Sequence, residues 1–343
     1  MIVKSASIVS GNSVNIMASE DDRVRVIMWT CPRTISTALT KCLSHIEGIE
    51  IWFEPYCFCI MAAMEYRRVY GSELPTAYEG HEEAFAKAAQ LISKMAVTPE
   101  GIIDPKRLAF EGVKSRLEKS NIKYVFVKDM TLAMAEPKYR RYLPNGYRHA
   151  FLIRRPAPVI ASYRKATIES FIASGYLSEE SRDERTFDIE KDNFLFDAGL
   201  FHQQLYESWK HVLEACDSAN RTVQSNSPDE PRRKRSCVPV IDSDDLLSKP
   251  DAVLQKFCRV IGLPYSQSLL KWDASPEVAY TWKAAGDDLL RYNEHFYRRA
   301  LRSTQFVPPK ARDTDEDDVT EDVRRLCLRA QPFYDEMYAC KLE

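Results

Sequence analysis

The chain has 343 residues, with 48 lysines and arginines against 50 aspartates and glutamates, and so a formal charge of −2. A protein that coats nucleic acid or an anionic membrane needs a basic excess, so this near-balance argues against both kinds of partner. A hydrophobic content of 45% with 29% charged residues is typical of an ordinary folded protein and excludes a disordered chain.

The nine cysteines are scattered, form no CxxC pair and combine with no histidine at the spacing of a zinc site. Scattered cysteines in odd number are typical of reduced thiols, so we expect a cytoplasmic protein without a bound metal. Polar residues break every apolar stretch of residues 1–22, which predicts a short leader and no signal peptide. No apolar run reaches the length of about 18 residues that a transmembrane helix needs.

The first predicted strand covers residues 24–29 (VRVIMW) and ends before Cys31-Pro32, where the pattern becomes helical. We expect this helix to end near Gly48, because glycine is the usual residue after a helix. A second apolar run, residues 49–53, follows directly. Strand, helix and strand together predict a parallel βαβ unit with a right-handed crossover.

Three further apolar runs predict strands at residues 124–127, 150–153 and 238–241. Residues 79–119 have a mostly helical period, and helical sequence resumes at Val159. Five apolar runs that alternate with helical segments predict an α/β fold with a largely parallel sheet and helices on both faces. Ligands of such folds bind at the carboxyl ends of the strands.

We expect one α/β domain over residues 23–308, followed by a helical and acidic tail over residues 309–343. Within the domain, residues 217–237 are polar and lack apolar periodicity, which predicts a surface loop or a disordered insertion. Residues 232–235 (RRKR) in this segment are either a localisation or polyanion-binding signal or, more simply, a solvated basic run.

The segment after the first strand reads CPRTIST (residues 31–37). A turn that opens a helix presents unpaired backbone N–H groups and the positive end of the helix dipole, so it favours an anion. Arg33 adds a positive charge, while Ser36 and Thr37 add hydroxyl donors. The ATPase loop GxxxxGK[ST] is excluded because its glycines and lysine are absent. The alternative interpretation is that Pro32 starts the helix and the hydroxyl residues cap it.

A second candidate segment reads LIRRPAPVIASY (residues 152–163) and contains Arg154 and Ser162. An arginine at the carboxyl end of a strand and a serine about two turns into the next helix can reach the same bound group. The arginine fork suits a phosphate, because it donates two parallel hydrogen bonds. The alternatives are a surface ion pair for Arg154 and a packing role for Ser162.

These segments resemble those of the P-loop sulfotransferases. CPRTIST resembles the 5′-phosphosulfate loop of that family, and LIRRPAPVIASY resembles its 3′-phosphate-binding segment. Residues 241–264, which end in Ile-Gly-Leu-Pro, look like its late strand and GLP helix region, and residues 303–306 (STQF) are similar to a C-terminal motif of a divergent branch. The motifs occur in the family's order and span residues 24–306.

The resemblance implies a three-layer α/β sandwich that moves the sulfuryl group of 3′-phosphoadenosine 5′-phosphosulfate (PAPS) to a hydroxyl or amine of a small-molecule acceptor, without a metal. It also implies which residues hold the donor: for the 5′-phosphosulfate Arg33, Thr34, Ser36 and Thr37, and for the 3′-phosphate Arg154 and Ser162. The family has a basic, glycine-containing loop near its C-terminus that closes on the nucleotide. Residues 283–286 (KAAG) are its only loose counterpart here.

The acceptor's proton needs a base. Some branches of the family use a glutamate after the second strand and others a histidine after a later strand, where this chain reads Val127-Lys128-Asp129. We therefore expect Glu54 to be the general base, the alternative being a capping or salt-bridged carboxylate. Lys128 is expected to touch the bridging oxygen or the substrate, or else to pair with Asp129 or another nearby acid.

Two other functions remain open at this point. A magnesium-dependent nucleotide kinase or NTPase is one, because YVFVKD (residues 124–129) looks like an apolar strand that ends in a metal-binding aspartate. A catalytically inactive relative that binds the nucleotide and acts as a scaffold is the other. Acceptor choice depends on loops, and the sequence indicates no oligomeric state.

Overall fold

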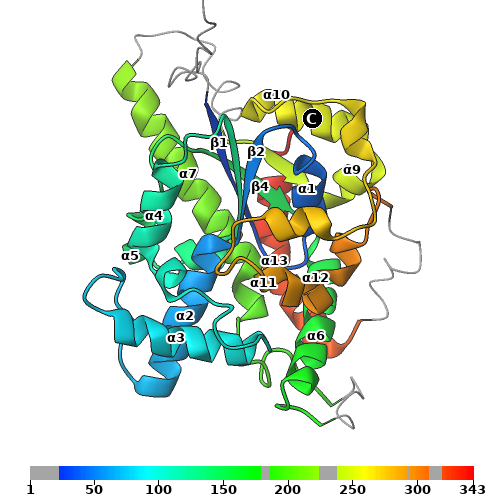
Figure 1. Ribbon diagram of the computed structural model, residues 1–343. Helices are drawn as coiled ribbons and strands as arrows, with labels where there is room; N and C mark the ends of the chain where they lie inside the picture. Colours follow the sequence, from blue (N-terminus) through cyan, green and yellow to red (C-terminus); the bar gives the residue numbers. More distant parts are fainter. Residues whose placement is uncertain (1–22, 179–185, 224–237, 293, 309–318) are drawn as a thin grey trace, which may run out of the picture.

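A computed structural model describes residues 23–178, 186–223, 238–292, 294–308 and 319–343 (Figure 1). The described chain forms an α/β fold in which helices cover both faces of a five-stranded sheet, as the sequence predicts. None of the helices in these ranges is both long and apolar enough to cross a membrane.

The sheet has the strand order β2-β3-β1-β4-β5, and every neighbouring pair is parallel. Its strands are β1 (Val24–Thr30), β2 (Ile49–Phe53), β3 (Tyr124–Met130), β4 (Arg148–Ile153) and β5 (Val240–Asp242). The first four contain the whole apolar run from which each was predicted, because a strand buried on both faces is apolar throughout, whereas β5 contains only Val240 and Ile241 of the run predicted over residues 238–241. The central strand β1 lies between β3 and β4, so the loops that follow these three strands share one edge of the sheet.

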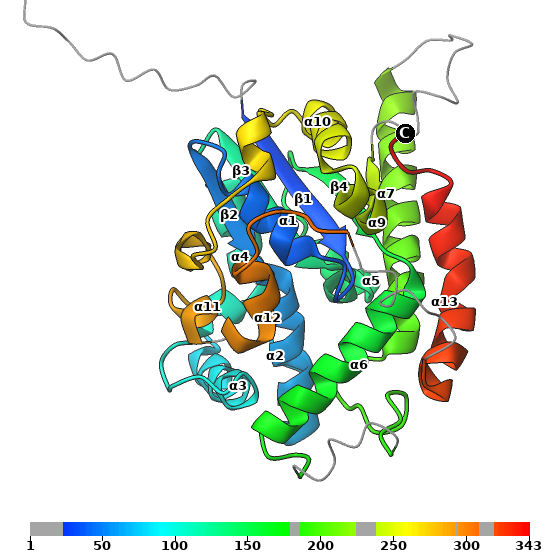
Figure 2. The same cartoon turned by 90° about the vertical axis from the view of Figure 1, so that its right-hand side faces the viewer.

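One face of the sheet carries α1 (Ser36–Leu43), α9 (Ser243–Ser248), α10 (Pro250–Ile261) and α12 (Glu294–Leu301) (Figure 2). Side chains of a strand alternate between faces, so Val26 and Met28 of β1 pack into this apolar cluster. The helix α1 begins directly after the loop that follows β1. Its position therefore depends on apolar packing against the same strand that positions the loop.

The opposite face packs against a second apolar cluster, to which Ile27 and Trp29 of β1 contribute. Its helices are α2 (Pro55–Tyr70), α4 (Phe110–Glu118), α5 (Pro137–Arg140), α6 (Pro156–Ala173), α7 (Phe201–Val223) and α13 (Glu321–Tyr338). A third cluster joins α2 to α3 (Glu82–Met95) and α11 (Leu289–Tyr292). Helix α6 begins at Pro156, three residues before the predicted Val159, because proline suits the first position of a helix.

The loop that the sequence predicts over residues 217–237 needs correction. Helix α7 continues to Val223, so the polar segment expected as a loop over residues 217–237 begins as helix. A helix that is already packed through its apolar side extends into polar sequence without needing an apolar stripe there. The remainder of that segment, residues 224–237, and the expected leader, residues 1–22, lie outside the described residues.

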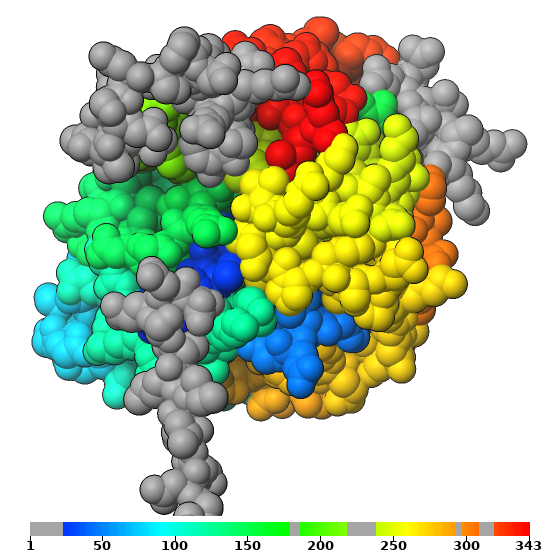
Figure 3. Space-filling model, turned by 90° about the horizontal axis from the view of Figure 1, so that it is seen from above, coloured from blue at the N-terminus to red at the C-terminus, as the bar shows by residue number. Residues whose placement is uncertain are grey.

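The C-terminal helix α13 is part of the α/β fold and not a separate tail. It packs on α6 and α7, and a buried ion pair joins Arg164 of α6 to Asp322 of α13 (2.9 Å between Nε and Oδ2). Beyond the helix, the backbone N–H of Leu342 donates to Val240 of β5 (2.8 Å). Figure 3 shows the C-terminal segment, in red, against the yellow segment that contains α10.

Candidate active site

The loop between β1 and α1 has a strained backbone held by internal hydrogen bonds. Arg33 (φ 66°) and Ile35 (φ 58°) both adopt the left-handed conformation, which costs a residue with a Cβ about 1–2 kcal/mol. The Thr34 hydroxyl donates to the backbone oxygen of Cys31 (3.1 Å). The Ser243 hydroxyl in turn donates to the backbone carbonyl of Thr34 (2.8 Å). The Thr34 side chain is fully buried inside the loop, so only its backbone can face a ligand.

The N-terminus of α1 has no side-chain cap. Within the described part of the chain, the hydroxyls of Ser36 and Thr37 in its first turn have no hydrogen-bond partner either. The neighbouring helix α2 differs, because the Asp129 carboxylate accepts from the backbone N–H groups of Tyr56 (2.7 Å) and Cys57 (3.0 Å). The N-terminus of α1 is therefore open to an anion.

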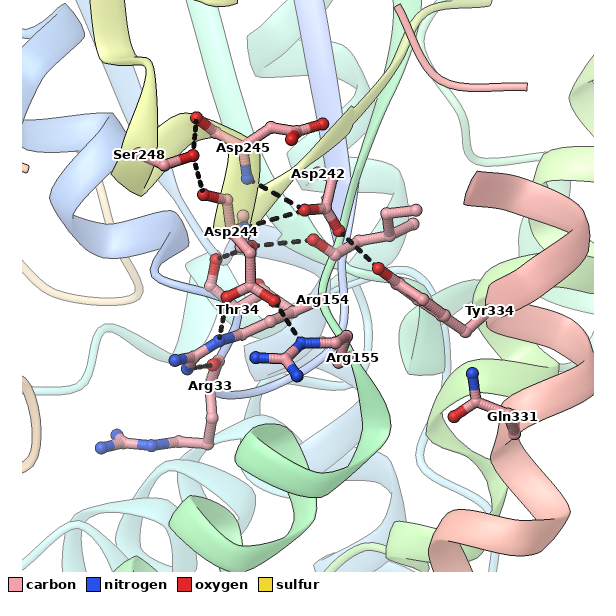
Figure 4. Close-up of polar contacts among 12 residues, drawn as sticks. Arg33, Thr34, Arg154, Arg155, Asp242, Asp244, Asp245, Ser248, Gln331 and Tyr334 are labelled. Carbon is pink, nitrogen blue, oxygen red and sulfur yellow. Dashed lines mark hydrogen bonds and ion pairs between the residues drawn. The ribbon is translucent and has the colours of Figure 1, made fainter. Parts of the chain in front are cut away.

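The structure brings Arg33, Arg154 and Ser162 together. Arg33 Nε donates to the Ser162 hydroxyl (2.9 Å), and Arg154 Nη1 donates to the backbone oxygen of Arg33 (2.9 Å). Figure 4 shows the guanidinium groups of Arg33 and Arg154 directed to the same side of the loop. Residues more than 120 positions apart in the chain thus form one basic group beside α1, because β1 and β4 are adjacent.

Arg154 is only partly neutralised by its surroundings. The carboxylate of Asp244 lies 3.9 Å from Arg154 Nε but hydrogen-bonds Arg155 at 2.7 Å (Figure 4). Arg154 Nε is buried, and no described residue accepts a hydrogen bond from it. Burial lowers the pKa of Arg154, whereas Asp244 raises it. A buried, charged N–H without an acceptor is costly, and an anionic ligand oxygen would remove that cost.

A third arginine, Arg299, lies within electrostatic range of Arg33 and Arg154. Burial lowers the pKa of Arg33, and the positive charge of Arg299 on α12 lowers it further. Arg299 acts on Arg154 in the same direction. Two arginines beside one helix N-terminus, with a third positive charge in electrostatic range, suit a ligand with more than one negative charge. The one sequence feature that could have indicated Arg299 is the pair Arg298-Arg299 shortly before the STQF motif.

The segment 283–286 does not reach this group. Lys283 pairs with the edge strand β2 through two backbone hydrogen bonds, to Ile51 (2.9 Å) and Phe53 (2.8 Å), and its ammonium binds Glu50 (2.5 Å). A Cβ at Gly286 would lie 1.8 Å from the carbonyl oxygen of Ile102. These residues therefore extend the sheet and pack against a neighbouring loop, and they are not the counterpart of a nucleotide-closing loop.

Glu54 lies at the end of β2 in a buried polar group. The residue has a left-handed backbone (φ 54°), and its side chain is 3% exposed. Lys128 at the end of β3 donates to Glu54 Oε1, and the Tyr297 hydroxyl of α12 donates to Oε2 (3.1 Å). Of the two roles considered for Lys128, the structure shows the pairing with a nearby acid, and that acid is Glu54. Asp129 instead caps α2.

Tyr297 connects the two parts of the site. Burial raises the pKa of its hydroxyl well above the ordinary value, the negative charge of Glu54 raises it further, and the positive charge of Arg33 lowers it. Tyr297 therefore lies within electrostatic reach of both the carboxylate and the basic group. Its ring packs edge-on against Phe53 with centroids 5.2 Å apart, which fixes α12 over the ends of β1 and β2.

Comparison with known proteins adds a family match. Residues 232–341 match the family model described as "Sulfotransferase domain". "Branched-chain-amino-acid aminotransferase-like protein 2" of Arabidopsis thaliana is 22% identical over 248 residues, which are 72% of this chain and 32% of that protein. The chain thus spans about a third of the length of this curated relative.

Three solved structures are similar to the chain. A sulfotransferase domain from the curacin biosynthetic pathway is 16% identical, with 90% of this chain and 98% of that one covered and a TM-score of 0.38. One from the Synechococcus PCC 7002 olefin synthase is also 16% identical (93% and 95% covered, TM-score 0.39). A sulfotransferase from Alicyclobacillus acidocaldarius is 14% identical (82% and 99% covered, TM-score 0.39). Likenesses of this degree say nothing of substrate or mechanism.

The family match covers the last third of the chain, including the residues that form α12 and α13. The motifs of the first two thirds, residues 31–37 and 152–163, occur in the order expected for the same family. The family match thus supports the resemblance to the sulfotransferases over residues 232–341.

Proposed function

We propose that the protein is a sulfotransferase that moves the sulfuryl group of PAPS to a hydroxyl or amine of a small-molecule acceptor. The observation that carries this proposal is the convergence of Arg33, Ser162 and Arg154 beside the uncapped N-terminus of α1. A nucleotide with phosphates at both its 3′ and 5′ positions has two separate anionic groups, and this site has cations from two separate strands.

In this proposal the 5′-phosphosulfate lies at the N-terminus of α1. Arg33, the hydroxyls of Ser36 and Thr37 and the backbone N–H of Thr34 would bind its oxygens, since the Thr34 side chain faces inward. The 3′-phosphate would take the free N–H of Arg154, which has no acceptor among the described residues. Ser162 contacts Arg33 in this structure, and its hydroxyl can also donate to the nucleotide.

Sulfuryl transfer requires that the acceptor and the donor be held in line and that fixed positive charge lie beside the leaving phosphate. The sulfur–oxygen bond to the 5′-phosphate breaks, and a bond from sulfur to the acceptor oxygen or nitrogen forms in line with it. Negative charge then builds on the leaving phosphate, where Arg33 and the helix dipole stabilise it. The acceptor's proton goes to the carboxylate of Glu54, which Lys128 and Tyr297 hold in one orientation.

The kinase alternative has less support because of what Asp129 does. Its carboxylate is fully buried and accepts three backbone hydrogen bonds, from Tyr56, Cys57 and Met130 (2.7, 3.0 and 2.8 Å). An aspartate used in this way caps a helix, whereas a magnesium ligand needs oxygens directed at the ion and its water.

Two assays test the proposal. Adenosine 3′,5′-bisphosphate without Mg²⁺ should raise the thermal midpoint of unfolding, because a ligand of the folded state stabilises it. Protection by ATP with Mg²⁺ and none by the bisphosphate would support the kinase instead. Transfer of ³⁵S-sulfate from labelled PAPS to a panel of small hydroxyl and amine compounds then tests turnover. Tight bisphosphate binding with no transfer to any compound would support the scaffold.

A further inference from the structure

Lys41 is a buried lysine that no motif points to. It lies on α1, one turn after Thr37, and its side chain has no exposed surface. An ammonium group carries three N–H donors and no acceptor, and an unsatisfied buried charge is among the most costly features of a fold. The partners of Lys41 must therefore account for its presence in the core.

All three donors of Lys41 reach backbone carbonyls of later segments. Nζ donates to Asp273 (2.7 Å), to Ser303 (3.0 Å) and to Leu301. No carboxylate forms an ion pair with it at hydrogen-bond distance within the described ranges. These contacts span more than 230 positions of the sequence, and they connect α1 to residues within the segment that matches the sulfotransferase family model.

Leu301 is the last residue of α12. The final carbonyls of a helix have no partner within it, and a cation placed there satisfies them and complements the helix dipole. The same helix carries Tyr297, whose hydroxyl donates to the Glu54 carboxylate (3.1 Å), and Arg299, whose charge lies within electrostatic range of Arg33 and Arg154. Lys41 thus fixes the far end of the helix whose middle contributes to the site.

We propose that Lys41 is a positioning residue that docks α12 onto α1, so that Arg299 and Tyr297 face the donor nucleotide bound at the start of α1. The proposal rests on the function proposed above, but the docking itself can be measured without it. Lys41 touches neither the reacting atoms nor the nucleotide, and it acts through α12.

The docking is tested first, by hydrogen–deuterium exchange of the full chain without ligand. In Lys41→Met, which keeps the length of the side chain but removes its donors, the amides of residues 297–303 should exchange faster than in the wild type. Leu117→Ala on α4 is the control, because it creates a cavity in the opposite apolar cluster. Unchanged exchange at residues 297–303 in Lys41→Met would overturn the docking role, whatever the protein's activity.

The consequence for the site is tested by calorimetric binding of adenosine 3′,5′-bisphosphate. Lys41→Met should weaken binding on the order of 10- to 100-fold, as is typical when a group that supports a binding residue is lost. Leu117→Ala should bind as the wild type does. Binding by the wild type and equal binding by Lys41→Met would overturn the proposal, whereas no binding by the wild type would contradict the proposed function.

A double-mutant cycle separates positioning from general destabilisation. If Lys41 acts through Arg299, Lys41→Met should weaken binding much less when Arg299→Ala is already present, because coupled residues are not additive. Full additivity of the two changes would contradict the proposal. Should Lys41→Met fail to fold, exchange of the wild type decides: bisphosphate must then protect residues 36–41 and 297–303 together, and protection of the first range alone would overturn it.

Discussion

Three residues with side chains adopt the left-handed conformation at the proposed site: Arg33, Ile35 and Glu54. Each lies in a loop that joins a strand to the following helix, where the chain reverses within a few residues. Such conformations persist only where surrounding contacts hold them, and they cluster at functional sites. Here the strain directs the Arg33 guanidinium to Ser162 and the Glu54 carboxylate to Lys128.

Replacement of Arg33 tests its contribution to the leaving group. We expect Arg33→Ala to lower turnover with PAPS by about 100- to 1,000-fold, the usual loss when one donor to a developing negative charge is removed. Arg324→Ala is a matched control, because Arg324 is an exposed arginine whose ion pair is with Glu321 on the surface. Unchanged turnover in Arg33→Ala would exclude this role.

The proposed base is tested by Glu54→Gln, which keeps the size of the side chain but cannot take the proton. Turnover should fall by roughly 100- to 10,000-fold if Glu54 is the base, and the pH–rate profile should differ from that of the wild type. Tyr297→Phe should retain most activity, since it removes one hydrogen bond to the carboxylate and leaves Lys128 in place. A wild-type profile in Glu54→Gln would contradict the assignment.

At the scale of elements, the N-terminus of α2 depends on one residue of another element. Asp129 of β3 accepts from two N–H groups of that helix and from its own neighbour Met130. Because α2 begins directly after Glu54, the same contact places the proposed base. Burial raises the pKa of Asp129 to about 7, against the backbone hydrogen bonds and Lys128, which lower it.

Asp129→Ala should lower the free energy of unfolding by about 1–3 kcal/mol, because it leaves buried N–H groups without an acceptor. Asp104→Ala is the comparison. Asp104 also caps a short helix, by accepting from Lys106, but it does so in an exposed setting, so its loss should be smaller. Chemical denaturation of both variants measures the difference, and equal small losses would show that Asp129 is not an essential cap.

The sequence predicts elements well where the signal is local. The five strands are short apolar runs bounded by polar residues, and the meeting of Arg33 with Arg154 follows once β1 and β4 are parallel neighbours. The sequence does not predict that α12 contributes to the proposed site, because Tyr297 and Arg299 are brought there only by the packing of α12 against α1 and β2. Lys41 is invisible for the same reason: its partners are backbone carbonyls, which no side-chain motif records.

Two histidines of the fold are held in neutral form: His202 is buried and His149 is partly buried. His149 accepts from Trp29 Nε1 at Nδ1 (2.8 Å), and burial lowers its pKa to about 4. His202 lies 2.9 Å from the carbonyl of Arg154, and burial lowers its pKa to about 4 as well. The unfolded chain binds these protons from about pH 6.5 downward and the folded chain only near pH 4, so stability falls as the pH falls between these values.

His149→Gln isolates one of these contributions. Between pH 7 and pH 4, the free energy of unfolding of the wild type should fall by up to about 3 kcal/mol more than that of this variant, because the variant has no imidazole at position 149 to protonate on unfolding. The raised pKa of Asp129 acts in the opposite direction over this range, but it is common to both proteins and cancels in the difference. Equal pH dependence of the two proteins in urea denaturation would contradict a neutral His149 in the folded protein.

The proposed function requires one nucleotide with two phosphate groups to connect the loop after β1 to the end of β4. A crystal structure with adenosine 3′,5′-bisphosphate bound tests it most directly. We expect the 5′-phosphate at the N-terminus of α1, within hydrogen-bond distance of Arg33, and the 3′-phosphate on Arg154. A nucleotide bound elsewhere, or one that touches only one of these two arginines, would contradict it.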